Sequence, residues 1–451
     1  MAGYYSKKWH TKVTVGRVDF ELMKKLVLKD VYVQDQHADT LLYAGALKFD
    51  IGSIDFTKHI LVLSNIEIDQ TKLHLVTYKN THELNLQFII DTFTSKDTAT
   101  RSNGKWDISA DGLTLDNVDF RLQNQNDTET VQGMNYAFLR VHNINSKISD
   151  IKFEEDTLRA TIEKMSANEQ SGFVLKNMFC YVKLSSHGMT LNALNIVTPQ
   201  TNLVTDLIFK FNKFRDFDDF VTNVHMQAAF KKSTICFQDV GYFVPGLRAV
   251  HNCFEISGLY TGTVSHLHGK NMNISWGKFS TFEGEADMNG LPDIDKTRIK
   301  VNVTNLVTSK KEIELLPRPP FDVEGNIKLP ENIDYLKTFH LSGNFDGLIS
   351  DFNADGVLTT DIGTIVAGLH LRQDTVQHTT YYKGTLQTES FNIGMFMNIK
   401  NMGAITSLVT IEGKGLRKDN ADAKIIGSMK SLYYNKYTYK NTTLNGELRK
   451  G

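Results

Sequence analysis

Apolar and polar residues alternate along almost the whole chain, and this alternation constrains the fold more than any other feature. It is clearest in residues 256–267 and 341–352, two copies of one phrase in which serine and glycine recur at the same places. A period of two is the signature of a strand with one buried face. A strand phrase repeated at such long spacing predicts a protein that grows by adding strands to a sheet, not one that encloses an active site.

A second pattern, apolar-x-apolar-x-x-apolar-x-apolar, recurs in the chain. Its step of three would move the apolar set to the other face of a strand unless one extra residue formed a β-bulge. In four copies this region carries Asp30, Asn65, Asn117 or Asn177, residue types that tolerate unusual backbone angles. We therefore predict bulged strands that each keep a single apolar face. The copies are Val13/Val15/Val18/Phe20, Leu26/Leu28/Val31/Val33, Leu61/Leu63/Ile66/Ile68, Leu113/Leu115/Val118/Phe120 and Phe173/Leu175/Met178/Cys180.

Helical patterns are scarce, with short helices expected only near residues 86–93, 214–220 and 390–400. Hydrophobic residues make up 41% of the chain and charged residues 22%, which is enough for a large core. Because so few helices cannot cover so many apolar strand faces, the sheet must pair with another sheet, close into a barrel or curl around its own apolar face. We predict a mostly β fold: an elongated, curled, antiparallel-rich sheet forming a U-shaped groove, with a few short helices.

The sequence offers little for catalysis, metal binding or nucleic-acid binding. The net charge is −1 and basic runs are absent, so no nucleic acid is expected as a partner. Residues 351–356 match the opening of a calcium loop, but Ile362 stands where the loop needs a glutamate. His266 and His268 share a strand face without a third metal ligand nearby. We predict no catalytic residue, no metal site, no cofactor and no enzyme activity.

The cysteines and the two ends of the chain bear on disulfide bonds and on membrane targeting. Three cysteines do not make a disulfide framework, and the fold is predicted not to depend on a Cys236–Cys253 bridge. The sequence contains no run of about 18 apolar residues, so no membrane-spanning helix is predicted. Residues 1–9 lack the apolar segment of a secretory leader. The final residues stop inside a strand-like pattern, which favours a piece of a larger protein.

Several motifs resemble the TamB and AsmA-like family of Gram-negative envelope proteins, in the form found in a Bacteroides-like lineage. The TamB-like motifs are structural glycines and aromatics in residues 343–347, 351–356, 358–363, 382–384, 391–394, 411–416 and 433–441. The AsmA-like motifs lie in residues 26–35, 39–44 and 85–88. On this resemblance we divide the chain into an AsmA-like region, 1–245, and a TamB-type repeated region, 246–451.

The resemblance implies a periplasmic β-taco, which is a long U-shaped sheet with an apolar interior. In the full-length protein it would be tethered to the inner membrane by an anchor that this chain lacks. Family members are implicated in phospholipid movement between the inner and outer membranes and in outer-membrane biogenesis. They meet an outer-membrane partner of the BamA/TamA type through parts absent here.

Our leading hypothesis is a lipid-transfer segment in which phospholipid acyl chains lie along an apolar β groove. The predicted groove residues are Leu26, Leu28, Val31, Val33, Leu61, Leu63, Ile66, Ile68, Tyr260, Val264, Phe345 and Ile349. A sandwich core is the alternative for each of them. The alternative function is a translocation and assembly scaffold, or chaperone, that offers its sheet edges to outer-membrane proteins. A β-helical carbohydrate enzyme is the third hypothesis, but the short-period coil and the acidic cleft that it needs are not visible in the sequence.

Overall fold

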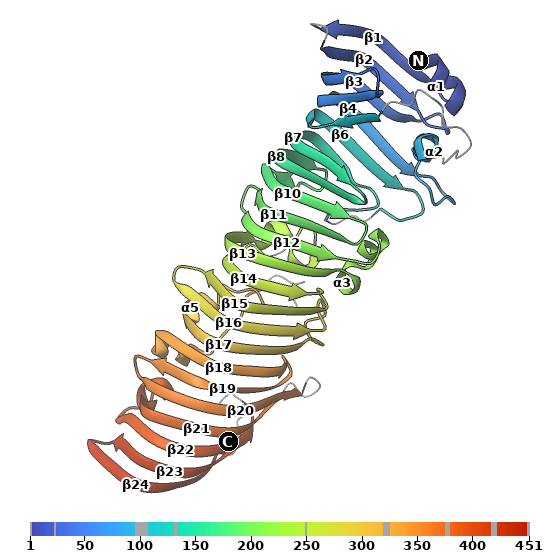
Figure 1. Cartoon of the computed structure of the whole chain (residues 1–451). Coiled ribbons are helices and arrows are strands. Elements are labelled where there is room, and N and C mark those ends of the chain that lie inside the picture. The colour runs from blue at the N-terminus through green and yellow to red at the C-terminus, as the bar shows by residue number, and fades with distance from the viewer. Residues whose placement is uncertain are drawn as a thin grey trace. The chain divides into compact units, whose positions relative to one another are not determined.

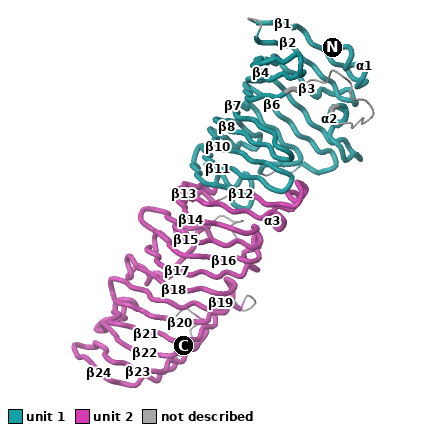
Figure 2. The backbone as a smooth tube through the Cα atoms, in the orientation of Figure 1, with its two compact units in different colours: residues 1–208, 238–248 teal, residues 209–237, 249–451 magenta. Residues whose placement is uncertain are grey.

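The computed structural model describes residues 2–21, 24–94, 107–129, 133–248, 250–318, 325–374, 379–415 and 422–448. It confirms the predicted fold class: the chain is mostly β, with 24 strands in a curled, unclosed, largely antiparallel sheet and only a few short helices. The strands follow one another almost in chain order within each part of the molecule (Figure 1). The chain divides into two compact units, residues 1–208 with 238–248 and residues 209–237 with 249–451 (Figure 2). The family-based boundary between residues 245 and 246 stays a prediction.

The first unit contains the N-terminal strands. They are β1 (Val13–Glu21), β2 (Lys25–Gln34), β3 (Thr40–Asp55), β4 (Ile60–Thr77), β5 (Asp107–Ala110), β6 (Leu113–Asn124), β7 (Arg140–Glu154), β8 (Thr157–Glu169), β9 (Val174–Leu175), β10 (Asn177–Ser185), β11 (Gly188–Val197) and β12 (Asn202–Lys210), which ends at the unit boundary. The pairings recorded within this unit are antiparallel except that β4 runs parallel to β5 and to β6. A parallel pair needs a long crossover, and the connection from β4 to β5 includes helix α2 (Gln87–Thr94).

The second unit is a run of antiparallel strands in chain order. They are β13 (His225–Cys236), β14 (Cys253–Gly262), β15 (His266–Trp276), β16 (Ser280–Asn289), β17 (Arg298–Ser309), β18 (Thr338–Leu348), β19 (Asp351–Thr360), β20 (Gly363–Asp374), β21 (Thr379–Asn392), β22 (Met402–Lys414), β23 (Asp422–Tyr434) and β24 (Tyr437–Leu448). Each pairs with the next.

The helices in the described part of the chain are too short to cover the sheet. The longest, α1 (Ala2–Trp9) and α2, have eight residues each. The others are η1 (Phe214–Asp219), α3 (Phe220–Asn223), α4 (Phe237–Val240), η2 (Pro245–Leu247), α5 (Lys310–Ile313), η3 (Glu331–Leu336) and α6 (Ile393–Met397). None of the helices in the described residues has the length and apolar character needed to cross a bilayer.

The irregular backbone needed to keep apolar residues on one face is present in the first unit. Asp30 and Asn117 have positive φ angles of 53° and 50°, as their residue types suggested. A Cβ atom on Gly16 of the neighbouring strand would lie 2.9 Å from the Cβ of Asp30, so glycine makes room for this kink. Near Asn65 the β3–β4 register shifts twice, between Asp50 and Ser53. At the fourth position, Asn177 begins β10 after a break from β9.

Two details of the sequence analysis were wrong. The repeated phrase is not one strand but a hairpin: β14 ends at Gly262 and β15 begins at His266, while β18 ends at Leu348 and β19 begins at Asp351. The step of three in each phrase therefore spans a turn and not a bulge.

The second error concerns the cysteines. Cys236 and Cys253 form a disulfide, whereas Cys180 is free and buried. Sequence spacing did not predict the bridge because the two residues become neighbours only through the β13–β14 register, which places them directly opposite one another.

Candidate apolar groove

The strand register of the second unit assembles a continuous apolar row. Each residue of this row pairs directly with a residue of the next strand, from Ala228 in β13 as far as β24. Every residue of the row is aliphatic, aromatic or glycine. The row is Ala228, Tyr260, Gly269, Ala286, Val301, Phe345, Ala354, Leu369, Gly384, Ile411, Ile425 and Gly446. Because the strand period is two, such a row is the floor of one face of the sheet.

A second row beside it has the same character from β13 to β23. It contains Met226, Gly262, Leu267, Met288, Ile299, Gly347, Phe352, Leu371, Tyr382, Gly413 and Ala423. A third row lies between these two apolar rows. Its side chains point to the opposite face of the sheet, and all of them are polar. It contains Gln227, Thr261, His268, Asp287, Lys300, Asp346, Asn353, His370, Lys383, Glu412, Lys424 and Glu447. Along these rows the two faces of the sheet differ in chemical character, and elsewhere the opposite face also carries the exposed apolar residues Val357, Leu408 and Ile426.

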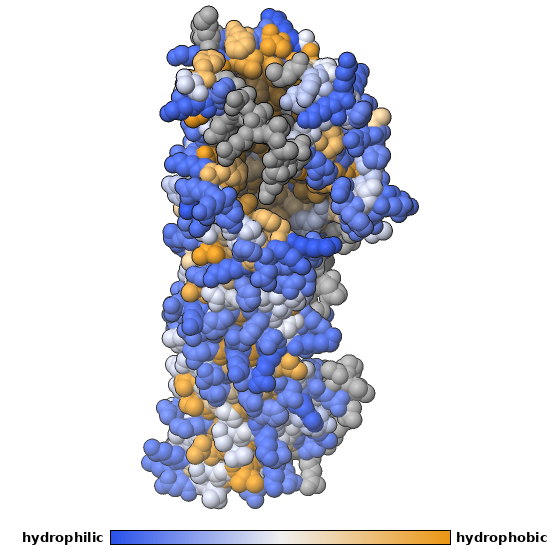
Figure 3. Space-filling model, turned by 45° about the vertical axis from the view of Figure 1, so that its right-hand side comes forward, coloured by the Kyte–Doolittle hydropathy of each residue, from blue (hydrophilic) through white to orange (hydrophobic). Residues whose placement is uncertain are grey.

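The apolar face is sheltered but not filled. Along β19 the residues of the apolar face, Phe352, Ala354, Gly356 and Leu358, are half-buried, whereas Asp351, Asn353 and Asp355 are exposed. Over β17–β20 the face encloses a cavity of about 300 Å³ lined mostly by aliphatic side chains, among them Val303, Leu358 and Leu369. Figure 3 shows hydrophobic residues at the depth of a hollow in the first unit and as separate patches among hydrophilic residues in the second. In the second unit, the described side chains therefore leave part of the apolar face unsealed.

One rim of the groove in the second unit is built over by short helices. Leu336, Phe339, Ile362 and Phe391 form a buried cluster, against which Leu358 and Ile365 of the apolar face pack together with residues of α5, η3 and α6. At the other ends of the strands, β14 joins β15 and β18 joins β19 through short turns without helices. The groove therefore has one covered rim and an opposite rim that the described residues leave bare at the β18–β19 turn, whereas at the β14–β15 turn the Ser265 N–H donates to the Val221 carbonyl of α3.

Four predicted groove residues of the first unit take corresponding places in apolar rows. Leu26 pairs with Phe49, which pairs with Ile66. Leu28 is connected to Ile68 through Leu47 in the same way. The rows continue across the parallel pair into Leu113 and Leu115 of β6.

The other predicted residues of the first unit are more buried or lie in a separate row. Val31, Val33 and Leu63 are 7%, 7% and 6% exposed, so they belong to the packed part of the unit. Leu61 and Leu63 pair with Ile54 and Ile51 at the other end of β3. Their predicted role as groove lining remains a prediction.

In the second unit the structure separates the four predicted residues into two pairs. Tyr260 and Phe345 lie in the continuous apolar row, each on its own strand. Val264 lies in the turn after β14, and Ile349 lies in the turn after β18, where it is 38% exposed. These two residues lie in hairpin turns at the rim instead of on the floor, because the phrases that contain them fold as hairpins.

The electrostatics of the two faces agree with their composition. Burial raises the pKa of Tyr260 within the apolar row. On the polar face, by contrast, a carboxylate oxygen of Asp287 lies 3.4 Å from a ring nitrogen of His266 and 3.5 Å from one of His268. The histidine pair that suggested a metal site therefore faces a carboxylate, and no group of three metal-binding residues occurs in the described residues.

The candidate calcium loop is ordinary strand. Residues 351–356 lie inside β19, whose residues pair with β18 and β20. Asp351 accepts a 2.7 Å contact from His370 of the adjacent strand. An extended strand points successive side chains to opposite faces, so it does not gather oxygen ligands around one ion.

Sequence reasoning found the period of the strands but missed the rows. It named Tyr260 and Phe345, and overlooked Leu369, Ile411 and Ile425, which continue the same floor. Their alternation with polar residues was a visible signal, but their alignment depends on long-range register. No protein-family model, no curated protein and no solved structure matches this chain.

Proposed function

We propose that this chain is a segment of a periplasmic, bridge-like lipid-transfer protein of the TamB and AsmA-like type. Phospholipid acyl chains lie along the apolar rows, while head groups stay hydrated at the bare rim. The observation that supports this proposal is the unbroken apolar row from Ala228 in β13 to Gly446 in β24. A row that only had to support a packed core would need another layer on top of it.

The energetics favour an apolar occupant over water. Each methylene removed from water gains about 0.8 kcal/mol. About ten methylenes lying along the floor would gain roughly 8 kcal/mol before the costs of binding are subtracted. Since the rows run across the strands without a charged residue, a chain can move along them without crossing an electrostatic barrier. The mechanism is passive and needs neither a catalytic residue nor a cofactor.

The disulfide supports the proposed location. Disulfides persist in oxidising compartments, among them the bacterial periplasm, and are rare in the cytosol. The Cys236–Cys253 bond therefore agrees with a periplasmic segment. In the full-length protein we propose an inner-membrane tether and an outer-membrane partner of the BamA/TamA type, both through parts outside this chain.

The proposal is tested by the phospholipid that purifies with the protein. Val409 points into the groove, whereas its neighbour Leu408 is 53% exposed on the polar face. We expect wild type and Leu408→Asp to carry phospholipid on extraction and mass spectrometry, and Val409→Asp to carry about tenfold less, because it buries a carboxylate against acyl chains. Absence of lipid from the wild-type chain, or equal loss in both variants, would contradict the proposal.

A scaffold for outer-membrane protein assembly remains the alternative function. Client binding of this kind would use backbone groups at sheet edges and not the apolar floor, so it would be retained in Val409→Asp. Lipid transfer predicts the opposite result for this variant.

A further inference from the structure

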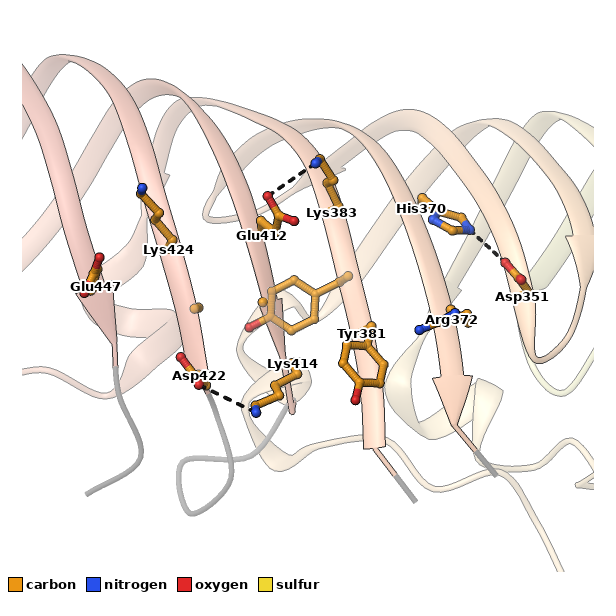
Figure 4. A pocket seen from close by; sticks show the side chains of 13 residues that line it. Asp351, His370, Arg372, Tyr381, Lys383, Glu412, Lys414, Asp422, Lys424 and Glu447 are labelled. Atoms are coloured by element: carbon orange, nitrogen blue, oxygen red, sulfur yellow. Dashed lines mark hydrogen bonds and ion pairs between the residues drawn. The ribbon is translucent and has the colours of Figure 1, made fainter. Parts of the chain in front are cut away.

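The two faces of the second unit offer a bound molecule different surroundings. On the polar face, side chains of β19–β24 surround a cavity of about 660 Å³ (Figure 4). Its ion pairs Lys383–Glu412 and Lys414–Asp422 join neighbouring strands at 3.3 Å and 3.8 Å. Cations and anions are mixed there, so this cavity selects no single class of ligand. Control over acyl chains must therefore come from the apolar face, where the proposed groove lies.

The apolar floor is not equally open along its length. Val301 of β17, Phe345 of β18 and Ala354 of β19 are half-buried, and the aliphatic cavity lies over these strands. Earlier in the same row, Ala286 of β16 is only 7% exposed and Gly269 of β15 is buried. The floor is therefore closed over β15 and β16 in this structure.

A β-bulge brings Met272 onto the closed stretch. In the β15–β16 register Gly269 pairs with Ala286 and Met272 pairs with Gly284, so three steps along β15 match two along β16. Asn271, inside this bulge, has a positive φ angle of 48°. The extra residue restores the alternation, so Met272 lies on the same face as Gly269 although they are three positions apart.

The Met272 side chain lies over Gly269. A Cβ atom at Gly269 would be 2.4 Å from the Met272 sulfur, 3.0 Å from its Cγ and 3.4 Å from its Cε. The methionine thus fills the place that a side chain at position 269 would take. The directly paired Gly343 and Gly356 differ, because the atoms nearest to a Cβ there are backbone atoms and both glycines line the open cavity.

Met272 is the part of the closed stretch that is able to move. It is 7% exposed, and the other buried residues of the stretch are Gly269, Gly284 and Ala286, which have no side-chain torsion. A methionine side chain has three rotatable bonds, and its thioether is only a weak acceptor, so rotation gives up packing contacts but no strong hydrogen bond. Rotation away from Gly269 would lower the floor and join the row from Tyr260 to Val301.

We propose that Met272 is a gate in the groove: an acyl chain occupies the stretch over β15–β16 after the thioether has moved off Gly269. The inference rests on the proposed function and adds the residue that controls where the chain lies. A binding-competent state that is populated at about 10% weakens the apparent affinity about tenfold. The stretch over β15–β16 should therefore fill later than the open cavity over β17–β20.

The test follows methionine, alanine and leucine methyl groups of the full chain by NMR. The protein is titrated with lysophosphatidylcholine that carries a nitroxide on its acyl chain, below the micelle concentration, so that methyl signals close to the bound chain broaden. Leu369, which lines the open cavity, should broaden first. Ala286 and Met272 should broaden at about tenfold higher lipid concentration, and the Met272 signal should shift as its side chain leaves Gly269.

Two variants and a matched control isolate the gate. In Met272→Ala the broadening of Ala286 should need about tenfold less lipid than in the wild type. Met395→Ala makes the same change at a residue of α6 that is 47% exposed, so it should behave as the wild type. Gly269 has no positive φ angle, so Gly269→Ala fits the backbone, and its methyl group should shift the Met272 signal without any lipid.

The outcomes separate the gate from the proposed function. Broadening of Ala286 at the same lipid concentration in the wild type and in Met272→Ala, with Leu369 broadened in both, would overturn the gate and leave lipid transfer standing. Broadening of neither Leu369 nor Ala286 in the wild type would instead remove the proposed function. A Met272 signal in the wild type that lipid leaves unchanged while Leu369 broadens also overturns the gate, and this result needs no variant to fold.

Discussion

Replacing Ile411 by alanine distinguishes an open groove from a filled core. Ile411 lies in the continuous row between Gly384 and Ile425 and is partly exposed. Complete burial of such a side chain is worth about 1.5–3 kcal/mol, and a half-sheltered one gains about half of that. We therefore expect Ile411→Ala to lower the free energy of unfolding by about 1 kcal/mol, well below the ~2–5 kcal/mol of a core position.

Phe391 provides the comparison with a true core. It is 3% exposed within the cluster under the helices of the covered rim. Phe391→Ala should cost about 3–5 kcal/mol, because it removes buried contacts and leaves a cavity. Leu408→Ala, on the exposed polar face, should change stability by less than about 0.5 kcal/mol.

The assay is urea unfolding of lipid-free protein, followed by circular dichroism. With a slope of about 1–3 kcal/mol per molar urea, the Ile411 and Phe391 variants are separable by their midpoints. The expected order of loss is Phe391→Ala, then Ile411→Ala, then Leu408→Ala. Equal losses for Ile411→Ala and Phe391→Ala would refute the reasoning, because the apolar row would then be a packed core with no room for a ligand.

Two further predictions concern the buried network and the disulfide. Burial acts to raise the pKa of Asp35, but hydrogen bonds that include one from Tyr78 outweigh burial and hold the pKa below its usual value. The ionised carboxylate therefore stabilises the folded protein above about pH 4. This contribution to folding stability is lost as the pH falls through the lowered pKa. Asp35→Asn should therefore cost about 2–4 kcal/mol at neutral pH in urea unfolding and weaken the acid dependence, whereas a cost below about 0.5 kcal/mol, as at an ordinary surface position, would contradict this. Replacing Cys236 and Cys253 by serine should cost about 2–4 kcal/mol, since the bond closes a loop with a sequence separation of 17; an unchanged urea midpoint would contradict this.

The sequence was sufficient for the fold class because strand periodicity is local. Alternation in each segment identified strands such as β2 and β4, and Asp30 and Asn117 marked two of the kinks that keep one face apolar. The lack of long amphipathic helices then required a sheet that shelters its own apolar face. This inference needed no knowledge of which strands pair.

Features that depend on pairing could not be predicted. The bridge between Cys236 and Cys253 and the row that joins Phe345 to Ile411 arise from register over many residues. Turns were also misread, because the local pattern around Val264 fits a bulge as well as a hairpin. The charged cavity was missed for the same reason, since its ion pairs join different strands.

The most direct measurement of the central claim is site-specific photocrosslinking at two adjacent isoleucines of β23. Ile425 lies in the apolar row, whereas Ile426 points to the other face and is 47% exposed. With a photoreactive residue at either site and radiolabelled phospholipid present, the account predicts a strong lipid adduct at 425 and little at 426. Equal labelling at both sites, or none at 425, would contradict the claim that this face is an open groove for acyl chains.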